Sequence, residues 1–254
     1  MLPLTFFLNY MYLQIIILAA GRGTRMRSEI PKVLGNLSGQ PLIRRLLDNI
    51  QNLKSGFSAV IVVGYKHELV EEYLGPAYTY AFQEEQLGTA NAVESAKDKI
   101  FADNAIVLYG DMPFITARSL EKLIAIHKDN NSKFSMFTAA VPHFEDQFNS
   151  HNGFGRIIRG PDRKIVSIRE LVDASEVEKK ILEVNPGVYM FDTTWLWQNI
   201  GLVKKNSHSE YYLTDLVDVA VKSGVEVFTA EIDPMEVFGI NTPEHLEESK
   251  KLPK

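Results

Sequence analysis

An apolar run that passes directly into a glycine-rich loop is the feature that most constrains how this chain can fold. Residues 14–20 are Gln-Ile-Ile-Ile-Leu-Ala-Ala, and Gly21 and Gly23 follow almost at once. A short β-branched and apolar run that ends at glycine is typical of a buried strand, here predicted at residues 15–19. The two glycines let the backbone turn tightly and expose N–H groups that can face phosphate oxygens. The sequence therefore predicts a first strand followed by a phosphate-binding loop.

The rest of the first half alternates between apolar runs and stretches with a helical spacing of apolar residues. Runs at residues 58–63 and 105–109 predict two more buried strands. Helices are predicted at residues 41–52, 67–73, 89–100 and 117–130. Strands that alternate with helices form a mainly parallel sheet covered on both faces. Right-handed crossovers then bring the loops after the strands to one edge of the sheet, where ligands bind.

The second half shows a different pattern. Strands are predicted at residues 134–141, 164–170, 185–191 and 226–231, and helices at residues 213–222 and 243–250. Neither a repeat nor a linker separates these elements from the first half, so we expect them to extend the same sheet. The predicted fold is a Rossmann-like nucleotidyltransferase fold, a single α/β domain over residues 14–254 with a mixed, mainly parallel sheet and helices on both faces. Residues 1–13 are predicted to be an N-terminal extension.

The apolar start of the chain allows two other interpretations, a secretory signal or a membrane span. Residues 1–20 have no basic leader and contain Asn9, Gln14 and Pro3, which disfavours both. We expect a cytoplasmic protein whose natural start could be Met11. The absence of cysteine suits a reducing compartment. The net charge of -5 argues against binding to nucleic acid or to an anionic membrane.

Cationic side chains extend the glycine loop. Thr24-Arg25 follows Gly23, and Lys32 lies further along, after Pro31. Arginine can bind two phosphate oxygens at once, whereas lysine acts as a point charge. The Walker A pattern and the three-glycine dinucleotide pattern are both absent, and a tight turn with surface cations is the alternative. The combination of strand, glycines and cations favours a phosphate-binding loop over residues 18–32.

A second motif, Gln-Glu-Glu-Gln-Leu-Gly-Thr-Ala-Asn-Ala, occupies residues 83–92. The amide of Gln83 can both donate and accept hydrogen bonds, which matches the edge of a pyrimidine base. Gly88 and Thr89 stand at the start of a predicted helix, where backbone N–H groups are free. The alternative is a capped helix beside a solvated glutamine. Beside the first motif, nucleotide binding is the favoured interpretation.

A third motif, Tyr-Gly-Asp-Met-Pro at residues 109–113, comes directly after a predicted strand. Asp111 would therefore face the ligand edge of the sheet, and carboxylate oxygen suits Mg²⁺. Asn241, in Gly-Ile-Asn-Thr-Pro, is its candidate partner, because a neutral amide oxygen leaves the ion enough positive charge to hold phosphates. The alternatives are a turn led by Asp111 into a proline and a helix cap at Asn241.

These three motifs together resemble the family of sugar-phosphate nucleotidyltransferases, and most closely the uridyltransferases that make UDP-N-acetylglucosamine. The resemblance extends over about residues 13–247. It implies a Mg²⁺-dependent reaction of UTP with N-acetylglucosamine 1-phosphate, in the supply of cell-wall precursors. The nucleotide-binding residues that it implies are Leu18, Ala19, Ala20, Gly21, Gln83, Gly88 and Thr89. It also implies catalytic roles for Arg25, Lys32 and Asp111, and a Mg²⁺ site at Asp111 and Asn241.

The same resemblance implies a sugar site further along the chain. Asn-Gly-Phe-Gly-Arg at residues 152–156 is similar to a glycine-tyrosine-glycine-arginine turn of the family. The sugar-binding residues that the resemblance implies are Tyr109, Gly110, Gly155, Glu170 and Asn185. The alternative is a hairpin turn at the glycines and a surface glutamate. Residues 210–215, Glu-Tyr-Tyr-Leu-Thr-Asp, also match the family, with no role evident from the sequence because the aromatic residues could be core.

The chain departs from the family pattern at three places, which we expect near the sugar and phosphate. Gly35 and Asn91 stand where histidine is usual, and residues 171–174 are Leu-Val-Asp-Ala where His-Lys-Asp-Ala is typical. The β-helix acetyltransferase half of the bifunctional enzymes is absent from the sequence, so no acetyl-CoA binding is expected. The expected partners are UTP and a sugar 1-phosphate, and a homo-oligomer is left open. The alternatives are another sugar 1-phosphate or triphosphate, or an inactive regulatory subunit that binds a nucleotide-sugar.

Overall fold

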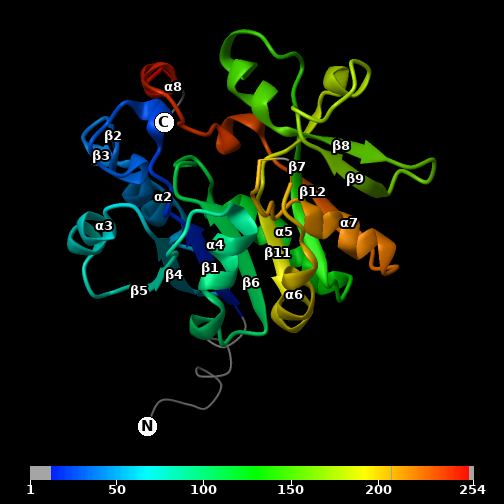
Figure 1. Cartoon of the computed structure of the whole chain (residues 1–254), viewed down its shortest axis with the longest axis horizontal. Coiled ribbons are helices and arrows are strands. Elements are labelled where there is room, and N and C mark those ends of the chain that lie inside the picture. Colours follow the sequence, from blue (N-terminus) through cyan, green and yellow to red (C-terminus); the bar gives the residue numbers. More distant parts are fainter. Residues whose placement is uncertain (1–12, 207, 252–254) are drawn as a thin grey trace.

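Helices cover both faces of a mixed sheet in the computed structural model, which describes residues 13–206 and 208–251 (Figure 1). Parallel pairing joins four strands in the order β5 (Thr79–Phe82), β4 (Ser58–Val63), β1 (Leu13–Leu18) and β6 (Asn104–Tyr109). Antiparallel pairing continues through β11 (Tyr189–Asp192), β7 (Phe134–Ala140), β10 (Glu183–Asn185), β8 (Gly155–Arg159) and β9 (Ile165–Arg169). β12 (Val227–Glu231) lies parallel to β7, and β2 (Asn36–Leu37) pairs separately with β3 (Gln40–Pro41). The predicted α/β class with a mixed sheet is confirmed.

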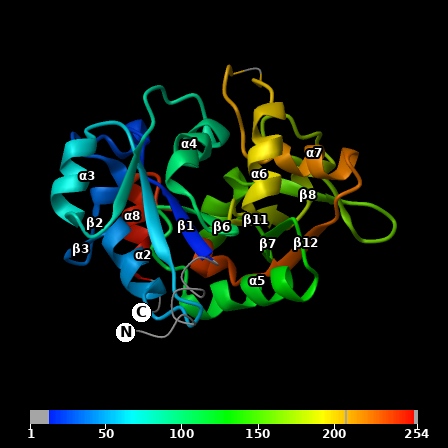
Figure 2. The ribbon, with the colours of Figure 1, turned by 90° about the horizontal axis from the view of Figure 1, so that it is seen from below.

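Alternate side chains of β1 enter two separate hydrophobic cores. Ile15 and Ile17 pack with α2 (Leu42–Ile50), α3 (His67–Leu74) and α5 (Ala117–Asp129) on one face. Ile16 and Leu18 pack with α4 (Thr89–Ser95), α6 (Thr193–Asn199) and α7 (Asp215–Lys222) on the other. Figure 2 shows α5 on one side of the strands and α6 and α7 on the opposite side. Because β1 is buried on both faces, its sequence is a continuous apolar run rather than an alternating one.

The strand order places β1 where the path of the chain reverses along the sheet. From β1 the chain moves outward to β4 and β5, and it then crosses back to β6 on the other side of β1. The loops after β1 and β6 therefore leave the same edge in opposite directions and leave a crevice between them, the usual ligand position in such sheets. The remaining helical segments are η1 (Thr24–Met26), η2 (Lys32–Leu34), η3 (Lys97–Lys99), η4 (Asp146–Gly153), η5 (Glu178–Lys180), η6 (Ile200–Leu202), η7 (Pro234–Val237) and α8 (Pro243–Ser249).

Several predicted elements differ from those observed, each for a local reason. The strand predicted at residues 185–191 is two strands, β10 and β11, because Pro186 and Gly187, the latter with a φ of 80°, break the extended backbone. The helix predicted at residues 89–100 ends as an α-helix at Ser95 and continues in η3. Strand β5 is missed because it lies at the edge of the sheet, and its exposed Phe82 departs from a buried apolar pattern.

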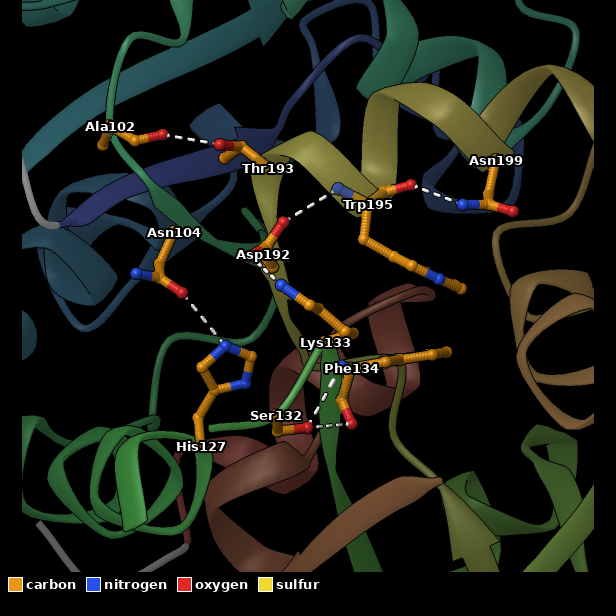
Figure 3. Close-up of polar contacts among 10 residues, drawn as sticks. All are labelled: Ala102, Asn104, His127, Ser132, Lys133, Phe134, Asp192, Thr193, Trp195 and Asn199. Carbon is orange, nitrogen blue, oxygen red and sulfur yellow. Dashed lines mark hydrogen bonds and ion pairs between the residues drawn. The ribbon is translucent and has the colours of Figure 1, made fainter. Parts of the chain in front are cut away.

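Polar contacts fasten the two halves of the sheet at the edge opposite the crevice (Figure 3). His127 of α5 contacts Asn104, the first residue of β6, and Lys133 pairs with Asp192 at the end of β11 at 2.8 Å. Asp192 also caps α6 by accepting a hydrogen bond from the Trp195 backbone N–H at 2.8 Å. The hydroxyl of Thr193, directly after β11, donates to Ala102 O, shortly before β6, at 2.7 Å, so a side chain as well as backbone pairing joins these two parts of the sheet.

No helix within residues 13–206 and 208–251 is long and apolar enough to cross a lipid bilayer. Of the predicted extension, residues 1–12 lie outside the described part of the chain, and Leu13 begins β1. The strand thus starts two residues earlier than the predicted run at residues 15–19.

Candidate functional site

Two adjoining pockets lie in the crevice beside the ends of β1 and β6. The loop pocket, of about 400 Å³, contains every residue predicted to bind the nucleotide. The hairpin pocket, of about 240 Å³, lies on the side of the β8–β9 hairpin and contains Gly155, Glu170 and Asn185. Lys32, Tyr109 and Asp111 line both pockets. Residues from distant parts of the sequence therefore form one composite site with two compartments.

The glycine loop shapes the first wall of the loop pocket. The backbone N–H of Ala19 donates to Val62 O at 2.8 Å, which continues the β1–β4 pairing into the loop. Gly23 has a left-handed φ of 67°, and a Cβ there would lie 2.5 Å from Lys32 Cβ. Gly21 is outside the left-handed region, and its missing Cβ would meet no protein atom within 4 Å. Only Gly23 is therefore required by the backbone, whereas Gly21 leaves space open towards the pocket.

Lys32 is the centre of a polar cluster where the two pockets meet. Its Nζ donates to Asp111 Oδ2 at 2.5 Å and to Asn241 Oδ1 at 2.9 Å, and Arg25 donates to the same Asn241 oxygen at 3.3 Å. Asp111 is 6% exposed, so its charge is balanced locally rather than by water. The structure thus brings together the four residues predicted for catalysis and metal binding.

The oxygens of Asp111 and Asn241 converge on one cation, the Lys32 ammonium. A carboxylate oxygen and an amide oxygen are hard donors of the kind that Mg²⁺ takes, one or two from the protein and the rest from phosphates and water. Within the described part of the chain, no group of three or more His, Cys, Asp or Glu side chains is arranged for a metal ion. The pair therefore fits a cation that is bound jointly with a phosphate ligand.

The hairpin pocket is assembled by strand register. Asn185 of β10 is the partner of Gly155 of β8, and a Cβ on Gly155 would lie 3.3 Å from Glu170 Oε1. Asn185 donates to the Tyr189 hydroxyl at 2.7 Å and accepts from the Gly187 backbone N–H at 3.0 Å. The side chain of Asn185 is therefore held in a fixed orientation, with one N–H still free of these two contacts.

Burial changes the acidity of two groups that line the hairpin pocket. It raises the pKa of the Tyr109 phenol well above the usual value, and the nearby Glu170 adds to the rise. Burial also raises the pKa of Glu170, and the charges of Asp215 and Asp173 act in the same direction. The pocket therefore presents a neutral hydroxyl and a carboxyl group with a weakened preference for the charged form. Both are suited to hydrogen bonding with the hydroxyl groups of a ligand.

Gly110, predicted to contact the sugar, lines neither pocket. Its backbone N–H donates to Leu18 O at 3.0 Å, and a Cβ there would lie 2.9 Å from Val33 Cγ1. There is no space for a side chain at Gly110, because β1 and Val33 pack against it. This packing explains the glycine at this position, and the predicted sugar contact of Gly110 stays a prediction.

The segment at residues 210–215 has a clear position in the structure. Tyr211 N donates to Leu87 O at 2.7 Å, Ala90 N donates to Tyr211 O at 2.9 Å, and Leu213 N donates to Thr89 Oγ1 at 2.9 Å. A Cβ on Gly88, whose φ is 106°, would lie 2.5 Å from Tyr211 O. This segment therefore holds the turn at residues 87–90 in place, and Glu210 reaches the loop pocket.

The structure gives the positions of the three places where the sequence departs from the family pattern. A Cβ on Gly35 would lie 3.0 Å from Lys32 O, and Val172 is 68% exposed. Asn91 was expected near the sugar and phosphate, but it accepts a hydrogen bond from Gln83 at 2.7 Å on the side of the loop pocket. The structure therefore places Asn91 against Gln83, because the first turn of α4 directs its side chain there.

Some residues that line the pockets were missed. Gln86 lines the loop pocket, and its spacing of three from Gln83 within one motif was an available signal. Thr214 lines the hairpin pocket although it follows Leu213 at the start of a predicted helix. No local pattern marks Thr214, because only the packing of α7 against β9 brings it to the pocket.

Comparison with known proteins gives one family match over most of the chain. The MobA-like NTP transferase domain matches residues 15–184. Bifunctional protein GlmU of Brevibacillus brevis is 37% identical over 241 residues, which cover 92% of this chain and 50% of that protein. Bifunctional protein GlmU of Streptococcus uberis is 40% identical over 207 residues, which cover 80% of this chain and 43% of that protein. The chain thus spans about half the length of the curated relatives it matches.

Solved structures share the fold at low sequence identity. UDP-glucose pyrophosphorylase complexed with UDP-glucose superposes with a TM-score of 0.77 at 16% identity, covering 94% of this chain and 97% of the other. CMP:2-keto-3-deoxy-manno-octonic acid synthetase complexed with CTP superposes with a TM-score of 0.67 at 18% identity, with the same coverage. These similarities establish the architecture of the sheet and its helices.

Proposed function

This chain belongs to the MobA-like NTP transferase family, and on that premise we propose that it transfers a uridylyl group from UTP to N-acetylglucosamine 1-phosphate. The products are UDP-N-acetylglucosamine and pyrophosphate. Family membership makes the chain a nucleotidyltransferase, in agreement with the resemblance predicted from its motifs. The choice of UTP and of the sugar is supported by the similarity to the two bifunctional GlmU proteins and by the residues of the two pockets.

The observation that carries the proposal is the meeting of the two pockets at Lys32 and Asp111. The loop pocket has room for a nucleotide beside the glycine loop and Gln83, and the hairpin pocket has polar groups suited to a sugar. A ligand in each pocket would bring its phosphate to the cluster of Lys32, Asp111 and Asn241. A transfer reaction between two phosphate-bearing substrates requires this arrangement.

The chemistry needs positioning and charge neutralisation rather than a protein nucleophile. An oxygen of the sugar phosphate forms a bond to the α-phosphorus of UTP, and the bond from that phosphorus to the bridging oxygen breaks. Pyrophosphate leaves with the bonding electrons. Arg25 would bind triphosphate oxygens, and Lys32 would turn from Asp111 towards the charge that develops at the reacting phosphates. The attacking oxygen is already anionic, so no general base is required.

Asp111 and Asn241 would hold the Mg²⁺ ion that the proposal includes. When bound, the ion neutralises phosphate charge and lowers the barrier to transfer. Hydrogen bonds within the chain orient both of these residues. Lys32 and Arg25 both donate to Asn241 Oδ1. Asp111 Oδ2 is similarly oriented by Lys32.

Replacing Lys32 tests the proposed site. We expect Lys32→Ala and Asp111→Ala to lower the rate of pyrophosphate release about a hundredfold or more, because removing one transition-state contact costs about 2.7–4 kcal/mol. Lys97→Ala is the matched control, since Lys97 is exposed in η3 and lines neither pocket. Rates are compared at saturating substrates, with thermal unfolding to verify the fold. Wild-type rates in both site variants would refute the assignment.

A screen of substrates tests the specificity that we propose. Pyrophosphate release is measured for each triphosphate with glucose 1-phosphate and with N-acetylglucosamine 1-phosphate, with and without Mg²⁺. The expected result is Mg²⁺-dependent release with UTP and the acetylamino sugar. Release with glucose 1-phosphate alone would replace the proposed sugar while leaving nucleotidyl transfer intact.

A further inference from the structure

The side chain of Gln83 has only one polar atom left to face a ligand. Gln83 is 4% exposed, lines the loop pocket, and is anchored by its backbone N–H, which donates to Val63 O at 2.8 Å. Its Nε2 donates to Gly88 O at 3.2 Å and to Asn91 Oδ1 at 2.7 Å. A primary amide nitrogen carries two hydrogens, so both are engaged by the protein. Within the described residues, no hydrogen bond to Oε1 is formed.

The hydrogen-bond partners of Gln83 Nε2 determine the orientation of the Gln83 side-chain amide. Gly88 O is a backbone carbonyl and can only accept, and it is itself held by the Ala92 backbone N–H at 3.1 Å at the start of α4. Turning the Gln83 amide over would place Oε1 against this oxygen. Asn91 Oδ1 is a second acceptor on the same side. If both amides turned over, Asn91 could donate to Oε1, but the contact with Gly88 O would still be lost, so the observed orientation is the one that satisfies both partners.

We infer that Asn91 is a positioning residue for nucleobase selection, which holds Gln83 so that Oε1 alone faces the loop pocket and selects a base with an imide N–H. This inference rests on the proposed function, which places the nucleobase in that pocket. Uracil presents N3–H, a donor that Oε1 can accept. Cytosine presents an unprotonated N3 at the same position, so two acceptors would face each other. The site should therefore bind UTP and reject CTP.

A glutamine that were free to turn would lose this selectivity. In one orientation its Oε1 would accept from uracil N3–H. In the other its Nε2 would donate to cytosine N3. A site that hydrogen-bonds one partner and leaves buried polar groups unpaired with another discriminates strongly. Asn91 is half-buried on the first turn of α4 and lines neither pocket, so it acts through Gln83 rather than by contact with the base.

Two substitutions at Asn91 separate positioning from general structure. Asn91→Leu has a similar size and no acceptor, whereas Asn91→Asp keeps acceptor oxygens towards Gln83 Nε2. We measure kcat/KM for UTP and for CTP with the same sugar 1-phosphate. The ratio of UTP to CTP is expected to fall about tenfold or more in Asn91→Leu, mainly through KM for UTP, and to remain near the wild-type value in Asn91→Asp. Ser95→Ala, which removes only a hydroxyl contact to Asn91 O on the same helix, is the control.

An unchanged ratio in a folded Asn91→Leu would overturn the inference, and so would an equal loss in Asn91→Asp. Equilibrium binding of UTP and CTP without a sugar phosphate gives the same ratio independently of turnover. If the wild-type protein binds UTP selectively but releases no pyrophosphate with any sugar phosphate, the proposed reaction fails and the inference about Asn91 is still decided by the binding ratios. If the wild-type protein binds CTP as well as UTP, the inference fails.

Discussion

Two glycines of the phosphate loop, alike in sequence, have different physical reasons to lack a side chain. Gly23 adopts a left-handed φ of 67°, and its Cα lies so close to Lys32 that a Cβ would overlap Lys32 Cβ at 2.5 Å. A non-glycine residue in this conformation is strained by about 1 kcal/mol before the overlap is considered. Gly21 has neither constraint, because a Cβ there would meet open space beside the loop pocket.

Alanine at these two positions should therefore have different effects. We expect Gly23→Ala to lower both the thermal stability and the rate at saturating UTP, because it displaces Lys32. Gly21→Ala should leave thermal stability unchanged and raise the KM for UTP several-fold, because its methyl group enters the space proposed for the triphosphate. Thermal unfolding and steady-state kinetics of both variants measure this. Equal loss of stability in the two variants would contradict the distinction.

At the scale of secondary-structure elements, the site depends on a contact between two loops. The turn at residues 87–90 begins α4, and the segment that contains Tyr211 runs beside it through three hydrogen bonds. Lys205 Nζ also lies 5.5 Å from the centre of the Tyr211 ring, a cation–π contact. The proposed base-reading turn is thus fixed by an element more than a hundred residues away in the sequence.

Substitution of Gly88 tests this contact between loops. Gly88 has a φ of 106°, and a Cβ would lie 2.5 Å from Tyr211 O and 2.8 Å from Tyr211 N. Such a backbone conformation costs a non-glycine residue about 1–3 kcal/mol, so Gly88→Ala should raise the KM for UTP about tenfold or more. Gly201→Ala is the control, because a Cβ there meets nothing within 4 Å and its φ is outside the left-handed region. A wild-type KM in Gly88→Ala would show that the two loops are not coupled.

At the scale of the whole molecule, a buried histidine joins α5 to two strands. His127 is 2% exposed, and its ring contacts Ser135 Oγ at 2.9 Å and Asn104 Oδ1 at 3.0 Å (Figure 3). An amide oxygen only accepts, so Nε2 donates to it and Nδ1 accepts from the Ser135 hydroxyl. The contact in which Nδ1 accepts requires the neutral ring, because protonation turns Nδ1 into a donor. Burial lowers the pKa of His127 from 6.5 to about 4, and Asp192 and Lys133 act on it in opposite directions.

This histidine should make the protein less stable in mild acid. The folded pKa lies below the unfolded one, so the unfolded chain binds the proton first as the pH falls. Stability should be full above about pH 6.5 and decrease towards about pH 4, by about 3 kcal/mol in total for this group. Burial lowers the pKa of His151 as well, so that group adds to the same trend.

The measurement is the free energy of unfolding in urea between pH 7 and pH 4.5. His127→Gln has no titrating ring, and its stability should fall less steeply with pH than that of the wild type, whatever its absolute stability. The remaining slope in the variant would come from His151 and other groups. Parallel slopes in the two proteins would contradict the assigned role of His127.

Sequence patterns predicted an element correctly where residues close together in the sequence define it. The boundaries of β4 agree with the apolar run at residues 58–63, because burial on both faces leaves a continuous signature. The glycine loop was also recognisable, since strand, glycines and cations lie within one short segment. By contrast, β10 and β11 were predicted as one strand, although Pro186 and Gly187, which break the extended backbone, lie between them in the sequence.

The sequence by itself determined most of the buried strands and longer helices, the glycine loop and the residue types available for binding phosphate and a base. The tertiary structure alone decided which of them meet. Lys32 contacts Asp111 across 79 residues and Asn241 across 209, and no periodic pattern encodes such pairings. The fold also placed Asn91 beside Gln83 and Gly110 beneath Val33. The physical reason is that strand order and helix packing set distances between side chains, whereas hydrophobic periodicity specifies only the face of the element on which each side chain lies.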